Sequence, residues 1–260
     1  MKMVKSISLL LVTALALNTV QAQKKLVWSD EFNYTGLPDS TKWGYDVGGH
    51  GWGNNELQFY VKGQPKNSRV EGGNLVIQVH KEAKENREYT SARLISKNKG
   101  DWKYGRIEAR AKLPQGRGIW PAIWMLPTEW KYGGWPRSGE IDIMEFVGYQ
   151  PDSVHGTVHT KAFNHTIGTQ QGKGLKFDDL STAFHVYAID WSADKIDFFV
   201  DDKLYLTFRN TGKGVDEWPF DQPFHLLLNI AVGGGWGGKM GIDTSIFPQR
   251  MEVDYVRVYQ

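Results

Sequence analysis

Four segments of this chain alternate apolar and polar residues with a period of two, and this pattern restricts the fold more than any other feature. They are GNLVIQVHKE (73–82), YGRIEARAKLP (104–114), FHVYAIDWSADKIDFFVDDKLYLTF (184–208) and MEVDYVRVYQ (251–260). Such alternation is typical of β-strands with one buried face. No long stretch carries a helical period. The sequence therefore predicts an all-β protein.

Turn residues divide the strands of the third segment. Ser192-Ala193-Asp194 and Asp201-Asp202 fit hairpin turns between antiparallel strands. Many short strands without interleaved helices favour two packed antiparallel sheets. We find no internal repeat, low-complexity tract or linker, so residues 23–260 are expected to form a single domain.

The N-terminus has the pattern of a signal peptide. Lys2 and Lys5 precede an apolar run from Ile7 to Leu17, which is too short to span a bilayer, and Val20-Gln21-Ala22 offers small residues for cleavage. We expect residues 1–22 to be removed and the protein to be secreted, either to the periplasm or to the medium. The alternative is a buried N-terminal helix.

Charge and cysteine content exclude several classes of function. After cleavage, 29 basic residues face 29 acidic ones, and no basic run remains, so nucleic acid and anionic lipid are not expected partners. No second apolar stretch reaches membrane-span length, and we expect a soluble monomer. The chain has no cysteine, which excludes disulfides, thiol catalysis and thiolate metal sites.

Three acids stand in an otherwise apolar segment, WPRSGEIDIMEFVG (135–148). On a regular strand Glu140 and Asp142 share a face, whereas Glu145, five residues after Glu140, lies on the opposite face. One extra residue at Ile143-Met144, a β-bulge, would return Glu145 to the face of the other two acids. The alternative is an edge strand with a solvated acidic face.

The bulge places the two glutamates at a catalytic distance. We estimate that their carboxyl groups lie about 5 to 6 Å apart, the separation found in retaining glycosidases. Glu145, next to apolar residues, suits the acid/base because desolvation and neighbouring carboxylates keep a carboxyl protonated. Glu140 suits the nucleophile, and Asp142 between them can share a proton with it.

The segment GEIDIMEFVG resembles the signature of glycoside hydrolase family 16 in its bulged form. The resemblance extends through WSDEFN (28–33), GWGNNELQFY (51–60), YTSARLISKNK (89–99), YGRIEARAKLPQGRGIWPAIWMLP (104–127), GTVH (156–159), FHVYAIDW (184–191), LLLNIAVGGGWGG (226–238) and FPQRMEVDYVRVYQ (247–260). It is similar to the laminarinase group, which cleaves β-1,3-glucans internally. The resemblance implies a β-sandwich (concanavalin-like jelly roll) of two curved antiparallel sheets with a concave substrate cleft. It also implies the same three roles for Glu140, Asp142 and Glu145.

For several further residues, the resemblance implies a role in substrate binding, while an ordinary structural role is the alternative. Trp120 and Trp124 share a strand face, where they either pack in a core or, as in the family, stack on glucose rings. His155 and His159 also share a face, but a metal site lacks a clear third ligand. We expect His159 to donate a hydrogen bond near the cleaved bond instead.

Three loop or strand residues complete the predicted substrate site. Asn55, in a Gly- and Asn-rich loop, is expected by resemblance to bond sugar hydroxyls, although such loops are also simple turns. Arg93 is either an ordinary ion-pair residue or, by resemblance, a hydroxyl-binding residue in the cleft. Trp236 lies in GGGWGG with little to pack on, which favours an exposed binding indole.

No cofactor is expected for catalysis, but the resemblance implies a structural calcium ion. Its oxygen ligands would be Glu31, Asp254 and a backbone carbonyl near Gly73, although isolated acids are usually just solvated.

The predicted function is a secreted retaining endo-β-1,3-glucanase with a β-glucan substrate. Activity on mixed-linkage β-1,3-1,4-glucan or a marine galactan is one alternative, and a noncatalytic carbohydrate-binding sandwich is another.

Overall fold

Two β-sheets form the fold in the computed structural model, which describes residues 24–260. The larger sheet has ten strands in the order β16-β15-β14-β9-β18-β5-β6-β3, with β1 beside β18 and β4 beside β5. Its strands are β1 (Leu26–Asp30), β3 (Gln58–Tyr60), β4 (Ser68–Glu71), β5 (Asn74–Lys84), β6 (Arg87–Ser91), β9 (Gly105–Lys112), β14 (His185–Trp191), β15 (Lys195–Val200), β16 (Lys203–Arg209) and β18 (Gln249–Tyr259).

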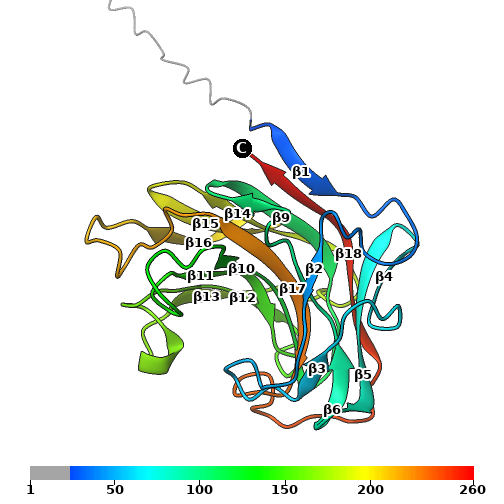
Figure 1. The fold of residues 1–260 in the computed structure, drawn as a ribbon. Helices are drawn as coiled ribbons and strands as arrows, with labels where there is room; N and C mark the ends of the chain where they lie inside the picture. Colours follow the sequence, from blue (N-terminus) through cyan, green and yellow to red (C-terminus); the bar gives the residue numbers. More distant parts are fainter. Residues whose placement is uncertain (1–23) are drawn as a thin grey trace, which may run out of the picture.

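The smaller sheet has eight strands in the order β13-β12-β11-β10-β17-β7-β2, with β8 beside β17. Its strands are β2 (Gly44–Asp46), β7 (Arg93–Ile95), β8 (Asp101–Trp102), β10 (Ile119–Pro127), β11 (Glu140–Phe146), β12 (Ser153–His159), β13 (Gln171–Lys176) and β17 (Phe224–Val232). Both sheets curve, and the eight-stranded sheet lies on the inside of the curve (Figure 1).

The predicted all-β sandwich is confirmed. All strand pairs are antiparallel except β3 and β6, which are parallel. The four alternating segments became β5, β9, β14 to β16, and β18, and the hairpin turns lie at residues 192–194 and 201–202 as predicted. Within residues 24–260 the helical structure is one short 3-10 turn, η1 (His165–Ile167). This part of the chain has no helix long and apolar enough to cross a bilayer. The predicted signal peptide lies outside the described residues.

One hydrophobic core fills the space between the sheets. Its buried side chains include Ile107 and Phe198 from the larger sheet and Ile141 and Phe146 from the smaller one. Burying each such side chain contributes roughly 1.5 to 3 kcal/mol. Because the chain has no cysteine, this apolar packing takes the place of covalent cross-links.

Strand β11 breaks its alternation at the predicted position. Against β12, Asp142 pairs with Thr157 and Glu145 with His155, so three steps on β11 match two on the partner. Against β10, the register shifts between Met144 and Asp142. Ile143 and Met144 both enter the hydrophobic core. The bulge therefore lets the strand bury two consecutive apolar side chains and still present all three acids on the other face.

Candidate active site

A cleft of about 560 Å³ lies over the inner sheet and contains Glu140, Asp142 and Glu145. On each of the two strands flanking β11, alternate residues reach the cleft, as the period of two requires. The complete lining is Trp52, Asn54, Glu56, Arg93, Trp120, Ala122, Trp124, Glu140, Asp142, Glu145, His155, Thr157, His159, His165, Gln170, Gly172, Lys173, Gly174, Asn229, Ala231, Gly235 and Trp236.

Glu140 is the first of the three acids on β11, and an indole N–H holds its carboxyl group. Its Oε2 accepts a hydrogen bond of 2.7 Å from Nε1 of Trp135, in the loop before β11. Burial raises the pKa of Glu140 to about 7, while hydrogen bonds from Trp135 and Asp142 act to lower it. Two hydrogen-bond donors, Trp135 and Asp142, therefore support the ionised form of Glu140.

Asp142 is the most deeply buried of the three acids, with 2% of its surface exposed. Burial, and then the charges of Glu140 and Glu145, raise its pKa well above the usual value. A hydrogen bond to Glu140 raises it further. A protonated Asp142 can donate a hydrogen bond to Glu140, which supports the ionised form of Glu140.

Glu145 is oriented by an indole from the neighbouring strand. Nε1 of Trp120 donates a hydrogen bond of 3.1 Å to its Oε1. Burial, followed by the charge of Glu140, raises the pKa of Glu145 to about 8 despite this bond. A carboxyl with this pKa is still protonated at neutral pH, as a proton donor must be.

His159 lies beside the first two acids. Its Nε2 is 3.4 Å from Oδ2 of Asp142 and 4.0 Å from Oε1 of Glu140. Each of these three side chains offers one atom that could ligate a metal ion, and these atoms all lie within 4.8 Å of one another. Burial lowers the pKa of His159 to about 4, so the ring is neutral at neutral pH. It therefore contributes polar contacts without a counter-charge.

Three predicted tryptophans line the cleft. Trp120 meets Trp236 edge to face at 5.6 Å between ring centroids. Nε1 of Trp124 donates a hydrogen bond of 2.7 Å to Oδ1 of Asn229, which fixes the plane of its indole. All three rings remain part of the cleft surface instead of the core. They can therefore stack on the apolar faces of sugar rings.

Arg93 lies between two indoles at one side of the cleft. Its guanidinium carbon is 4.6 Å from the ring centroid of Trp52 and 4.7 Å from that of Trp124. Asp46 pairs with its Nε at 3.0 Å. Arg93 is thus both an ion-pair residue and part of the cleft lining, so the two alternatives from sequence are not exclusive.

The asparagine predicted to bond sugar hydroxyls from the loop before β3 is wrong by one position. Asn55 is exposed and does not line the cleft, whereas Asn54 does. The backbone of Asn55 has a left-handed φ of 58°, which turns the chain at this point. An alternation argument does not apply inside such a turn, and so the sequence could not decide between the two asparagines.

Several residues of the cleft were not predicted from the sequence. Trp135 and Asn229 bond directly to predicted site residues, and Glu56 adds a fourth carboxylate to the lining. Asn229 is a polar residue within the apolar strand β17, and this was a usable indication of a site. Trp135 and Glu56 come from irregular segments whose paths the sequence pattern does not define.

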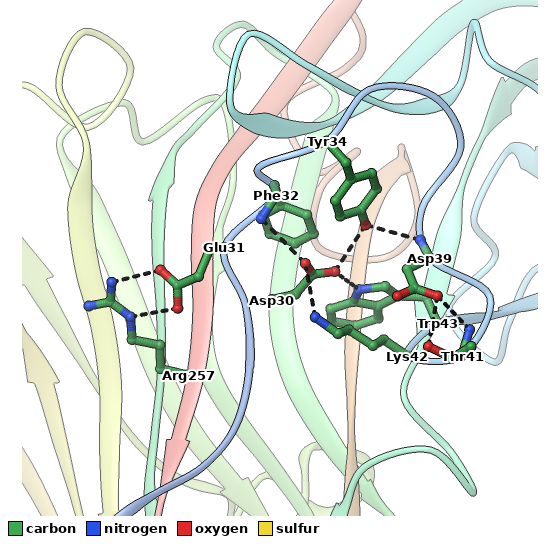
Figure 2. Close-up of polar contacts among 9 residues, drawn as sticks. All are labelled: Asp30, Glu31, Phe32, Tyr34, Asp39, Thr41, Lys42, Trp43 and Arg257. Atoms are coloured by element: carbon green, nitrogen blue, oxygen red, sulfur yellow. Dashed lines mark hydrogen bonds and ion pairs between the residues drawn. The ribbon is translucent and has the colours of Figure 1, made fainter.

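The residues predicted to bind calcium have other partners, as Figure 2 shows for Glu31. Glu31 accepts two hydrogen bonds from Arg257, at 3.0 and 2.7 Å. Arg110 donates a bond of 2.6 Å to Asp254, and Gly73 lies in the turn between β4 and β5. Arginines neutralise both carboxylates, so this arrangement does not fit a calcium ion. The calcium ion remains a prediction.

A curved β-sandwich with three carboxyl groups between tryptophans in its concave cleft defines a glycoside hydrolase. A model of the family described as glycosyl hydrolases family 16 matches residues 54–257. The chain therefore belongs to glycosyl hydrolase family 16.

Individual relatives cover most of the chain. It is 59% identical to a beta-glucanase from Rhodothermus marinus, over 91% of this chain and 85% of the relative. An X-ray structure of the laminarinase from Rhodothermus marinus matches with a TM-score of 0.90 and 57% identity, covering 92% of this chain and 98% of the other. A keratan-sulfate endo-1,4-beta-galactosidase from Sphingobacterium multivorum is 40% identical over 91% of this chain and 55% of the relative.

Proposed function

We propose that this protein is a retaining endo-β-1,3-glucanase that acts by double displacement. The observation that carries the proposal is the bulge in β11, because it brings Glu140, Asp142 and Glu145 to one cleft. The similarity to a laminarinase supports the choice of substrate.

In the first step, a carboxylate oxygen of Glu140 attacks the anomeric carbon of the sugar on the glycone side. The bond from that carbon to the glycosidic oxygen breaks, and Glu145 transfers its proton to the departing oxygen. A glycosyl ester on Glu140 results, and the aglycone part of the glucan leaves. The lower pKa of Glu140 and the higher pKa of Glu145 support this division of roles.

In the second step, Glu145 is ionised and removes a proton from a water molecule. The water oxygen attacks the anomeric carbon, and the ester bond to Glu140 breaks, which restores the β configuration. Asp142 donates a hydrogen bond that stabilises Glu140 as a leaving carboxylate. Trp120 keeps Glu145 aimed at the same position for both proton transfers.

The experiment compares Glu140→Gln and Glu145→Gln with the wild type by reducing-sugar release from laminarin. General acid–base catalysis alone contributes roughly 10²- to 10⁴-fold, so each variant should lose at least about 10²-fold in turnover. Glu82→Gln, on a strand of the other sheet, is the control and should keep full activity. A folded Glu140→Gln enzyme with near wild-type turnover would refute the mechanism.

A galactan is the second candidate substrate. It is favoured by the 40% identity to a relative named as an endo-galactosidase. The same assay on laminarin, lichenan, agarose and carrageenan separates the candidates, and we expect the fastest release from laminarin. Faster release from agarose or carrageenan would replace the glucan by a galactan, and faster release from lichenan would indicate a mixed-linkage enzyme.

We further propose that the enzyme is exported after cleavage behind Ala22 and acts as a monomer. The lysines, apolar run and small residues of the first 22 positions support export. N-terminal sequencing of the mature protein and light scattering test the two statements. A mature chain that still starts at Met1, or a particle of twice the monomer mass, would contradict them.

A further inference from the structure

A fourth carboxylate lines the cleft, and no bond forms or breaks on it in the double displacement, although its charge adds to the rise in the pKa of Glu145. Glu56 lies just before β3, and 6% of its surface is exposed. Burial raises the pKa of this carboxyl. A polar group this deeply buried is costly unless partners satisfy it, and its partners indicate a specific orientation.

The two oxygens of Glu56 differ in how far they are satisfied. Oε2 accepts a hydrogen bond of 2.6 Å from Nε2 of Gln58 and one of 3.4 Å from the hydroxyl of Tyr60. Among the described residues, Oε1 accepts one long bond of 3.4 Å, from Nδ2 of Asn54. A carboxylate oxygen has two lone pairs, so Oε1 keeps capacity for a further donor.

Hydrogen bonds to strand β17 fix the chain segment that carries Glu56. Oε1 of Gln58 accepts a bond of 2.8 Å from the backbone N–H of Val232, at the end of β17. The backbone N–H of Leu57 donates 2.9 Å to the carbonyl of Val232. These bonds fix the segment against the inner sheet, so the carboxylate is positioned before any substrate binds.

A chain of hydrogen bonds connects Glu56 to the indole of Trp124 through Tyr60 and Asn229. The hydroxyl of Tyr60 accepts a bond of 3.0 Å from Nδ2 of Asn229, whose Oδ1 in turn accepts one from Trp124. The network therefore presents two groups to the cleft, the indole of Trp124 and the oxygen of Glu56. β-Linked glucose has an apolar face that stacks on indole and equatorial hydroxyls at its edge, which suits such a pair.

Small residues leave room for a sugar ring near these groups. Ala122 on β10 pairs with Asn229 on β17, and Ala231 pairs with Trp120. Both alanines line the cleft. A larger side chain at either position would take up cleft volume beside Asn229 or Trp120.

The geometry points to Glu56 as a substrate-binding carboxylate whose Oε1 accepts a hydrogen bond from a hydroxyl of the bound glucan. This inference rests on the proposed function and names a recognition contact of that same cleft. It assigns Glu56 to affinity and specificity, separately from the bond-breaking work of the three acids on β11.

The test measures binding in a hydrolytically inactive background. Calorimetry with laminaritetraose gives the Kd of Glu140→Gln, and then of Glu140→Gln combined with Glu56→Ala or Glu56→Gln. Hydrogen bonds to charged groups are the stronger class, so Glu56→Ala should weaken binding roughly 10- to 100-fold. Glu56→Gln keeps an acceptor oxygen without the charge, and its loss should be smaller.

Glu108 provides the matched control. It is buried to a similar extent, with 7% exposed, but it lies on β9 of the other sheet and bonds to Arg106. Glu108→Gln in the same background should leave the Kd unchanged.

An unchanged Kd in both folded Glu56 variants would overturn the inference. If Glu56→Ala does not fold, Glu56→Gln decides, because it preserves the shape of the side chain. Failure of the proposed function is distinguishable, since it would appear as laminarin hydrolysis by Glu140→Gln alone.

Discussion

Replacing Glu145 by glutamine should lower turnover at least about 10²-fold and also stabilise the fold at alkaline pH. The usual pKa of a glutamate is 4.5, and burial raises that of Glu145 to about 8 in the folded state. Below pH 4.5 both states are protonated and the residue costs nothing. Between 4.5 and 8 the unfolded chain releases the proton while the folded chain retains it, so folding stability falls as pH rises.

The size of the effect follows from the same interval. Each pH unit between the two pKa values is worth about 1.36 kcal/mol, which gives on the order of 3 to 5 kcal/mol in the free energy of unfolding by pH 9. Glutamine has no charge to desolvate, and its oxygen still accepts the bond from Trp120. Glu145→Gln should therefore match the wild type near pH 4 and exceed it at pH 9, by roughly 10 °C in Tm.

Urea unfolding followed by tryptophan fluorescence at pH 4, 6, 8 and 9 measures the difference in the free energy of unfolding between Glu145→Gln and the wild type. Glu82→Gln is the control of opposite sign. The hydrogen bond from Lys66 lowers the pKa of Glu82, so its stabilisation is present above pH 4.5 and is lost as pH falls. A difference between Glu145→Gln and wild type that stays constant from pH 4 to 9 would refute the reasoning.

Three further predictions concern the reaction itself. The pH dependence of kcat/KM on laminarin should be bell-shaped, with an acidic limb near pH 7 as Glu140 loses its charge and a basic limb near pH 8 as Glu145 loses its proton; full activity at pH 4 would contradict it. Deleting Met144 should remove the bulge and abolish turnover, whereas Met144→Leu keeps both; a folded, active deletion variant would disprove the geometry. Trp124→Ala should raise the KM for laminarin about tenfold or more through lost stacking, as initial rates would show, and an unchanged KM would argue against a stacking role.

The sequence predicted the strand framework and the bulge because both follow from side-chain alternation. Glu140, Asp142 and Glu145 violate the parity of a regular strand, and the apolar residues between them have to be buried somewhere. One extra residue satisfies both demands, and the observed pairing has it between Asp142 and Glu145. A prediction of this kind succeeds because burial leaves few alternatives.

The loops could not be predicted in the same way. The choice between Asn54 and Asn55 depends on a left-handed turn, and the position of Glu56 depends on its bond to Gln58 and its pairing with Gly233. Trp135 reaches Glu140 from a loop whose path has no period. Such contacts are set by tertiary structure, which local sequence patterns do not encode.

The most direct test of the central claim is azide rescue with an activated substrate, dinitrophenyl β-laminaribioside, and product analysis by NMR. In Glu140→Ala, azide should take the place of the missing nucleophile and give the α-glycosyl azide. In Glu145→Ala, azide should attack the glycosyl ester on Glu140 and give the β-glycosyl azide. The reverse pair of products, or rescue of neither variant while both remain folded, would contradict the roles that the bulged strand assigns to its two glutamates.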